Sequence, residues 1–471
     1  MSHSKVQANA GVSQASRERL ILLVLLTASF TLAVDFSILN VALPAIGAEV
    51  GFSLEHLQWI ATSFALGAAG FTLLFGRVAD LYGRRRLFLL GMLLLGISSL
   101  VGGLATTPTV LLMARVAQGL ATAMVTPAAL SLLTTAFPEG PTRARALGLN
   151  GALMAAGFTT GAILGGVLAD LLSWRWAFFI NVAVAVLVLA IAPRILQESR
   201  SSSRPRLDLP GAVAVTLALL AIVYGLTRAG ETGWGEPLAL VMLGAGALLL
   251  VAFWVVEQRT ATPLISVTIL KRSTVAWGNI AGLLAFATET SLVFLITLYL
   301  QKVLGFTPLQ AGLSFAVLGA GTVIGGIIGP KLIGRIGAKK AIVLGLLIQA
   351  AATLPLAFLG LDRTWMPFLL ILTFVGGVAN LAAIVGFMVT ATSGLPDEEQ
   401  GLATGLATMS QQVGITMGIP VMSALVTARL HALGDETPQS VLSSLSSAIT
   451  VNAAFCVLTA VLVGLFLGRK P

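Results

Sequence analysis

The feature that most constrains this chain is a series of apolar runs, each long enough to cross a lipid bilayer. A spanning helix needs about 20 mainly apolar residues, and runs of this length follow one another from Leu20 to the C-terminal region. Hydrophobic residues make up 57% of the chain and charged residues only 10%, against about 25% charged in ordinary soluble domains. The sequence therefore predicts an all-α polytopic membrane protein.

The same length rule, with Gly, Pro and charged clusters as breaks, predicts fourteen transmembrane helices. The first run is too long for the apolar region of a signal peptide and carries Asp35, so we expect it to be a retained helix. The fifth and sixth runs are separated only by the segment SWRW. The expected helices are 20–46, 56–79, 87–106, 109–136, 146–172, 174–195, 209–228, 237–257, 275–302, 309–333, 339–358, 365–392, 403–430 and 444–467.

Lysine and arginine placement predicts the orientation, because cytoplasmic loops are enriched in both residues. Most of the 28 lysines and arginines fall in the N-terminal stretch, the C-terminal end and the loops that follow even-numbered helices. The loops on the other side hold only Arg175, Arg228, Lys302, Arg363 and Arg429. We therefore expect both termini to be cytoplasmic.

The basic charge does not indicate a nucleic acid partner. The formal net charge is +9, but nucleic acid binding needs basic residues clustered on one solvated face, and here they lie in short segments between apolar runs. The single cysteine, Cys456, excludes an internal disulfide. No phosphate-binding loop, metal-ligand spacing or catalytic constellation occurs, so we expect no cofactor, no metal and no enzyme activity.

The chain reads as two duplicated halves with an insertion between them. The turn sequences GRVADLYGRRR at 76–86 and GPKLIGRIGAKK at 329–340 each follow the second helix of a half. Parallel repeats around a central site are a transporter architecture. The expected units are a cytoplasmic tail (1–19), an N-terminal six-helix bundle (20–196), a cytoplasmic linker (197–208), two inserted transmembrane helices (209–257) and a C-terminal six-helix bundle (275–468).

Three ionisable residues lie inside the apolar runs, where such residues mark functional sites by default: Asp35, Arg115 and Glu289. Asp35 lies about 22 Å along its helix at 1.5 Å per residue, at a level that Arg115 can reach from an antiparallel helix. We expect the two to pair, either as a proton-coupling site or as a permanent structural ion pair. Glu289 has no evident basic partner, so we expect it to exchange protons, or else to remain protonated and bonded to a backbone carbonyl.

Four motifs resemble the major facilitator superfamily, specifically its fourteen-helix drug:proton antiporter branch. They are DFSILNVALP (35–44), the 76–86 turn, RVAQGLATAMVTP (115–127), and GFTTGAILGG with WRWAFFIN (157–166 and 174–181). The resemblance implies a major facilitator fold with two six-helix halves plus two inserted helices. It also implies a proton-driven exporter of amphipathic, cationic drugs or toxic metabolites, working by alternating access as a monomer in the cell inner (plasma) membrane bilayer.

The resemblance further implies roles for single residues. Asp35 would couple protons with the participation of Arg115, and Asp80 and Arg84 would form a cytoplasmic gate. The second-half copy of the turn has Ile333 where Asp80 aligns. The gating and packing residues implied are Gly76, Asp80, Gly83, Arg84 and Arg86 in the turn, and Gly157, Gly161 and Gly165, which form a groove on one helix face.

At one position the fifth-helix motif departs from the family pattern. Ala162 stands where the antiporter motif usually has proline. The glycine packing face does not depend on that residue, whereas a proline kink in the helix does.

Interior amides and aromatic residues are candidates for substrate contact. Amides can hold helices together, and aromatic rings can either pack or stack on a cationic substrate; packing is the simpler role for each residue alone. The candidates are Asn40, Trp59, Phe158, Phe286, Asn380 and Gln411.

Two alternatives to an exporter remain open from the sequence. A proton-coupled importer would share these motifs and accumulate its solute. An uncoupled channel or a receptor would carry spanning helices without uphill transport, although the duplicated halves and the gate motif argue against it.

Overall fold

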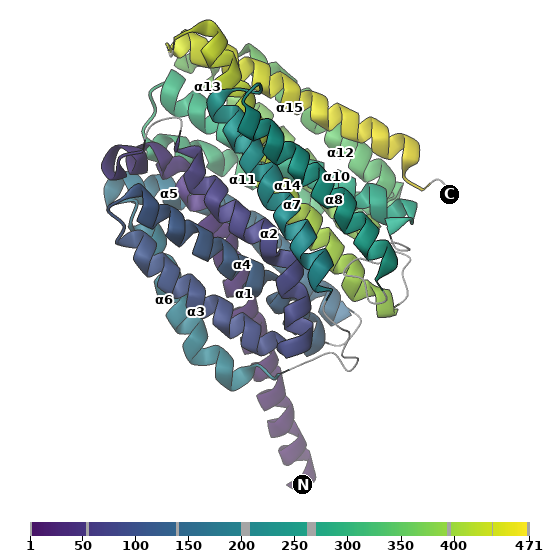
Figure 1. The fold of residues 1–471 in the computed structure, drawn as a ribbon. Coiled ribbons are helices and arrows are strands. Elements are labelled where there is room, and N and C mark those ends of the chain that lie inside the picture. Colours follow the sequence, from purple (N-terminus) through teal and green to yellow (C-terminus); the bar gives the residue numbers. More distant parts are fainter. Residues whose placement is uncertain are drawn as a thin grey trace.

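The computed structural model describes residues 2–52, 56–137, 141–198, 208–260, 270–392, 397–435 and 437–468, and these residues are almost entirely helical (Figure 1). Fourteen long α-helices occur in the described part of the chain. They are α1 (Ser2–Val50), α2 (Gln58–Tyr82), α3 (Arg84–Gly103), α4 (Pro108–Ala136), α5 (Pro141–Leu171), α6 (Trp176–Ile195), α7 (Leu209–Thr232), α8 (Pro237–Arg259), α10 (Ser273–Leu298), α11 (Pro308–Ile336), α12 (Ala338–Thr353), α13 (Met366–Thr392), α14 (Asp397–Leu433) and α15 (Pro438–Phe466). Short helices η2 (Tyr299–Val303), η3 (Leu354–Phe358) and η4 (Arg363–Trp365) extend or connect them.

The fold confirms the predicted all-α polytopic class. Among the described residues, thirteen helices are long and apolar enough to cross a membrane. In α2 the described apolar stretch is shorter, running from Trp59 to Thr72. The short segment SWRW does separate two helices, since α5 ends at Leu171 and α6 begins at Trp176.

Helix α1 is longer than the sequence indicated. It begins at Ser2, whereas its apolar run begins at Leu20. Once a helix is nucleated, each further residue adds a hydrogen bond at small cost, and no proline interrupts the polar segment. The expected N-terminal tail is therefore helical over most of its length.

The helices form two groups joined along a seam (Figure 1). Helices α1 to α6 pack mainly on one another, and so do α10 to α15. Across the seam, α5 packs along α11 and α2 packs along α14. The described part of the expected linker 197–208 is limited to residues 197, 198 and 208, so its remainder lies outside the described residues.

The inserted pair lies beside the seam. Helices α7 and α8 pack on each other, and α7 contacts both α2 and α14. The Thr216 hydroxyl donates a 2.6 Å hydrogen bond to the Gly70 carbonyl of α2. Toward α14, the contact includes apolar side chains such as Val215 and Leu219, which belong to one cluster with Leu406 and Val413. The pair therefore bridges the two groups.

Local signals in the sequence explain where several helices begin. Thr307 caps α11 by accepting the Gln310 N–H, while the Gln310 side chain accepts the Thr307 N–H in a capping box. The Thr107 and Thr437 side chains cap α4 and α15 by accepting the N–H groups of Val110 and Ser440, and each is followed by proline in the first turn. These caps satisfy N–H groups that a helix start otherwise leaves without partners.

The glycine groove on α5 receives α1. A Cβ atom at Gly157 would lie 2.9 Å from the Phe30 carbonyl oxygen, and at Gly165 it would overlap the Ile38 carbonyl oxygen. The two backbones approach so closely only because these positions lack side chains. Helix α5 is continuous through Ala162, the position where the family motif usually has proline. The Ala162 side chain is 2% exposed, and its carbonyl oxygen faces Gly312 of α11.

We expect Gly165→Ala to destabilise the protein by about 1 to 3 kcal/mol, the usual cost of overpacking. The matched control is Gly151→Ala in the same helix, where a Cβ atom meets nothing within 4 Å. Thermal unfolding of the purified variants in detergent measures both. Equal unfolding temperatures for the two variants would contradict the close α1–α5 contact.

A polar cluster ties three helix ends together at the end of the N-terminal group opposite the 76–86 turn. Glu49 accepts hydrogen bonds from Trp174 Nε1 at 2.6 Å and from Arg175 Nη2 at 2.8 Å. Arg175 Nη1 also donates to the Gly103 and Ala105 carbonyls. The Trp174 hydrogen bond is the largest cause that lowers the pKa of Glu49 below its usual value of 4.5. Burial opposes this effect, and the hydrogen bond and charge of Arg175 add to the lowering.

Because the pKa of Glu49 is lowered by folding, its contribution to stability is present above pH 4.5 and is lost as the pH falls through the depressed value. Glu49 is half exposed, so the contribution is at most about 1 kcal/mol. We expect wild type to unfold at a higher temperature than Glu49→Gln at neutral pH, and the gap to close in acid. A gap that stays constant with pH would exclude this role.

Candidate functional site

An ion pair between Asp35 and Arg115 is buried inside the N-terminal group. Arg115 Nη1 lies 3.3 Å from Asp35 Oδ2, and each side chain is only 1% exposed. It is the one fully buried ion pair among the residues that the structure describes. The structure thus brings together two of the three ionisable residues singled out from the sequence.

Neighbouring groups hold the Arg115 guanidinium in place. Its Nε donates to the Ile60 carbonyl at 3.1 Å, and its Nη1 donates to Gln118 Oε1 at 2.8 Å. Its Cζ lies 4.3 Å from the centre of the Phe64 ring, a cation–π contact. Helix α2 therefore contributes a carbonyl and a ring to a charge carried by α4.

The Asp35 carboxylate is also surrounded by donors. Gln118 Nε2 donates to Asp35 Oδ1 at 3.1 Å and to Ser99 Oγ at 2.8 Å, and Asn181 Nδ2 of α6 donates to Asp35 Oδ1. Five helices, α1, α2, α3, α4 and α6, thus meet at this ion pair. Hydrogen bonds to the remaining lone pairs are what make a buried ion pair tolerable.

Glu289 lies in the other group, away from this ion pair. It is partly buried on α10 and makes no hydrogen bond or ion pair with any described residue. It lines a cavity of about 20 Å³ together with Gln349, Thr353 and Asn380. The remaining lining residues are Leu292, Val293, Leu318, Leu356, Leu372, Thr373, Gly376 and Gly377.

Next to Glu289, an uncharged polar network joins four helices of the C-terminal group. Asn380 Nδ2 donates to Gln349 Oε1 at 3.1 Å, and Gln349 Nε2 donates to Thr288 Oγ1 at 3.3 Å. Asn452 Nδ2 donates to the Thr288 carbonyl at 3.0 Å and to Ser291 Oγ at 2.9 Å. These residues come from α10, α12, α13 and α15.

The two networks occupy matching places in the duplicated halves. Asp35 and Thr288 are separated by the same number of residues as Gly76 and Gly329, the first glycines of the two repeated turns. Each network is completed by an asparagine on the last helix of its half, Asn181 or Asn452. The first half therefore contains a charged polar network around Asp35 and Arg115, the charged hub. The second half contains an uncharged network around Thr288, the neutral hub, with Glu289 beside it.

The 76–86 turn contacts the end of α6. Gly83 has φ +117°, a conformation that favours glycine, and a Cβ atom there would lie 2.6 Å from the Glu198 carboxylate. Glu198 accepts the Arg85 and Arg86 N–H groups at 3.1 and 3.3 Å, which places a negative charge at the α3 N-terminus. Arg84 and Gly76 are partly buried, and the Asp80 side chain lies outside the described residues.

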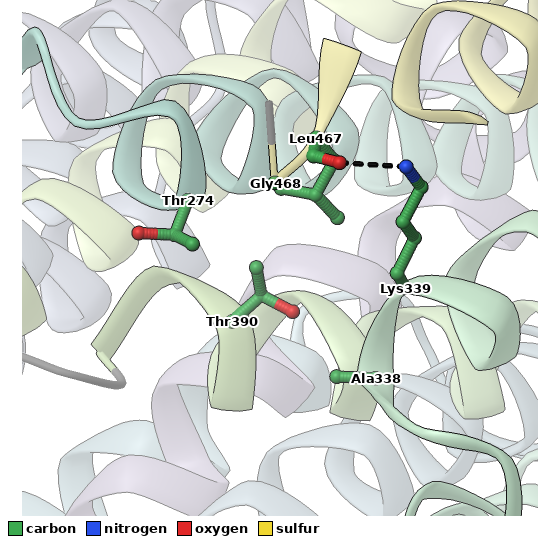
Figure 2. A pocket seen from close by; sticks show the side chains of 6 residues that line it. All are labelled: Thr274, Ala338, Lys339, Thr390, Leu467 and Gly468. Atoms are coloured by element: carbon green, nitrogen blue, oxygen red, sulfur yellow. Dashed lines mark hydrogen bonds between the residues drawn. The ribbon is translucent and has the colours of Figure 1, made fainter. Parts of the chain in front are cut away.

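A similar contact closes the second half. Figure 2 shows Lys339, in the first turn of α12, donating a 2.6 Å hydrogen bond to the Leu467 carbonyl at the end of α15. In the first half, Arg85 Nη2 donates to the Pro193 carbonyl near the end of α6. Beside Lys339 is a hollow of about 240 Å³ lined by Thr274, Ala338, Lys339, Thr390, Leu467 and Gly468, none of them a predicted site residue.

The candidate substrate residues have separate packing partners. Phe158 stacks on Phe36 with ring centres 5.9 Å apart, and Phe286 meets Phe387 edge to face. Trp59 packs against Tyr224 of the inserted pair at 5.7 Å. Asn380 belongs to the neutral network, Gln411 is buried on α14, and the Asn40 side chain lies outside the described residues.

Several polar residues of the site were not singled out from the sequence. Ser99, Asn181, Gln349, Thr353 and Asn452 are all buried. Asn181 is the last residue of the WRWAFFIN motif, and that position was its only signal. Single hydroxyl and amide residues are common in spanning helices, so their presence alone does not show which of them face a charge.

Spanning helices in two groups around buried charged residues define a membrane transporter. The sequence matches the Major Facilitator Superfamily over residues 25–419, and the chain belongs to this family of transporters. The predicted family membership is thereby confirmed.

Individual relatives extend along nearly the whole chain. The chain is 38% identical to the cephamycin export protein CmcT of Amycolatopsis lactamdurans over 420 residues, covering 87% of this chain and 85% of that protein. It is 36% identical to the puromycin resistance protein pur8 of Streptomyces alboniger, covering 94% and 90%. The fold is similar to that of the human organic anion transporter MFSD10, with TM-score 0.63, 17% identity and coverage of 93% and 99%.

We expect removal of one member of the ion pair, by Asp35→Leu or Arg115→Met, to destabilise the protein by about 3 to 5 kcal/mol, because the other charge remains buried without compensation. The double variant should be more stable than either single variant, since both charges are gone. Unfolding in mixed micelles measures all three. A double variant as unstable as the worse single variant would contradict the coupling between the two residues.

Proposed function

We propose that this transporter exports amphipathic, cationic antibiotics or toxic metabolites in exchange for protons that enter the cell. Export, as opposed to uptake, is supported by one observation: along 87% to 94% of its length the chain is similar to proteins named for antibiotic export or resistance. The multidrug resistance protein Stp of Mycobacterium tuberculosis, 33% identical over 403 residues, adds a third such relative. Cells that carry such an exporter should resist its substrates.

The buried charges support the proton coupling. A charge deep in a spanning helix is costly and is retained at proton and ligand pathways. Asp35 would release and take up a proton as its contacts with Arg115, Gln118 and Asn181 change between conformations. Glu289, with no basic partner among the described residues, would be a second proton-exchanging carboxyl in the other half. Proton coupling would then be divided between the halves.

The seam between the two groups supports alternating access. Helices α2 and α14, and α5 and α11, are the contacts that a rocking motion would open and close. Asp80 and Arg84 of the 76–86 turn would form the cytoplasmic gate. The contacts of Glu198 with the Arg85 and Arg86 N–H groups would hold the start of α3 in place beside it. The lysine and arginine distribution supports cytoplasmic termini in a cell inner membrane.

Efflux from cells tests the proposal. Cells that express wild type should expel cationic dyes and puromycin, and an uncoupler should stop this. Asp35→Asn and Glu289→Gln should each reduce efflux to the level of cells without the transporter, because an amide cannot exchange a proton. Efflux is compared at equal amounts of transporter in the membrane, because Asp35→Asn also leaves the Arg115 charge without its partner. The control is Glu236→Gln. Glu236 lies outside the apolar runs, and glutamine keeps an oxygen that can accept the Ala239 N–H.

Purified protein in liposomes distinguishes the alternatives. With an imposed pH gradient, an exporter should move substrate uphill against the proton flow. Uphill movement in the direction of the proton flow would indicate an importer. Substrate movement that never exceeds equilibrium would indicate a channel. Either result, or wild-type transport by both carboxyl variants, would overturn the proposal.

A further inference from the structure

Glu289 shares its cavity with two buried polar atoms that lack partners. Among the twelve lining residues it is the one ionisable side chain. Thr353 is 1% exposed and Asn380 is 2% exposed, yet Thr353 Oγ1 and Asn380 Oδ1 have no hydrogen-bond partner. Both residues line the cavity from neighbouring helices, α12 and α13. Buried polar groups without partners are rare, and they indicate an ordered water molecule or ion that completes them.

The size of the cavity suits one water molecule. Its volume is about 20 Å³, and a buried water needs at least about 10 to 15 Å³ by the same measure. A buried water also needs two to four polar partners. The Thr353 hydroxyl, the Asn380 carbonyl oxygen and the Glu289 carboxyl supply three. The other walls are leucine, valine and glycine apart from Gln349 and Thr373. The Gln349 side chain already bonds to Asn380 and Thr288, and the Thr373 hydroxyl donates to the Leu370 carbonyl.

We propose that one ordered water molecule occupies this cavity and bridges Glu289, Thr353 and Asn380. The water donates to Asn380 Oδ1, and the Thr353 hydroxyl donates to the water. Through Asn380 it also connects Glu289 to Gln349 and Thr288, and so to the neutral hub of the second half. The hub itself contains one further titratable neighbour, the Cys456 thiol, which bonds to Thr288.

The water gives Glu289 a hydrogen-bond partner that the protein does not provide. Any proton entering or leaving the carboxyl from the cavity side meets this water first. That transport role rests on the proposed proton coupling, whereas the presence of the water does not. The two can therefore be tested separately.

A cavity-filling variant tests the water site directly. A methyl group at Gly376, which lines the cavity, would meet only Ala352 Cβ, at 3.7 Å, so Gly376→Ala fits without a clash. The matched control is Gly464→Ala on α15, whose methyl group would meet only Val343, at 3.9 Å, and which does not line the cavity. Thr353→Val removes the hydroxyl with little change of shape and provides a second, independent variant.

Infrared difference spectra of the reconstituted protein, recorded in ordinary water and in water labelled with oxygen-18, provide the readout. Wild type and Gly464→Ala should show a bound-water O–H band that shifts with the label and is altered in Glu289→Gln. Gly376→Ala should lose that band, and Thr353→Val should shift it. In Gly376→Ala the Glu289 carboxyl band should move to the higher frequency of a group without a hydrogen bond.

Several results would overturn the water site. They are a wild-type spectrum without a label-sensitive band, a Gly376→Ala spectrum identical to wild type, or a carboxyl band that moves on adding sodium, which would indicate a cation in place of water. Proton flux in liposomes tests the transport role: Gly376→Ala should slow it relative to Gly464→Ala. If the water band is lost but the proton flux is unchanged, the water does not take part in proton transport, whereas the water site itself is supported.

Discussion

The architecture of the N-terminal group depends on burying one ion pair in a lipid-embedded bundle. Two charges at 1% exposure are tolerable only when every remaining lone pair and N–H group finds a partner. Arg115 and Asp35 therefore require Gln118 beside them, a carbonyl of α2 and an amide of α6. That requirement fixes the relative positions of five helices more specifically than packing of leucine and valine, because polar partners must match in direction as well as in volume.

The second half meets the same architectural need without charge. Thr288 stands where Asp35 would align, and amides on three other helices bond to it directly or through one another. Both halves of the duplicated fold therefore contain a buried polar network, but only the network of the first half contains an ion pair. The buried acidic residue of the second half, Glu289, lies one residue further along the chain, outside this network and against a small cavity.

The sequence predicted the fold well, because run length and loop charge are strong signals in membrane proteins. It also predicted the Asp35–Arg115 contact, since a short carboxylate deep in a spanning helix has few partners available. It could not identify Asn181 or Asn452, because run length does not show which face of a helix turns toward the hub. For the same reason the sequence does not decide between packing and substrate contact for Trp59, Phe158 and Phe286, each of which packs against a different aromatic neighbour.

The inserted helices have an unequal attachment to the two groups. Helix α7 is hydrogen-bonded to the α2 backbone through Thr216, and its contact with α14 includes a cluster of apolar side chains. Apolar surfaces can slide past one another without leaving a polar group unsatisfied, whereas a broken hydrogen bond in lipid cannot be replaced by water. In the proposed rocking motion, the Thr216 hydrogen bond would hold α7 to α2, and the apolar cluster toward α14 would be a surface along which the two groups can slide.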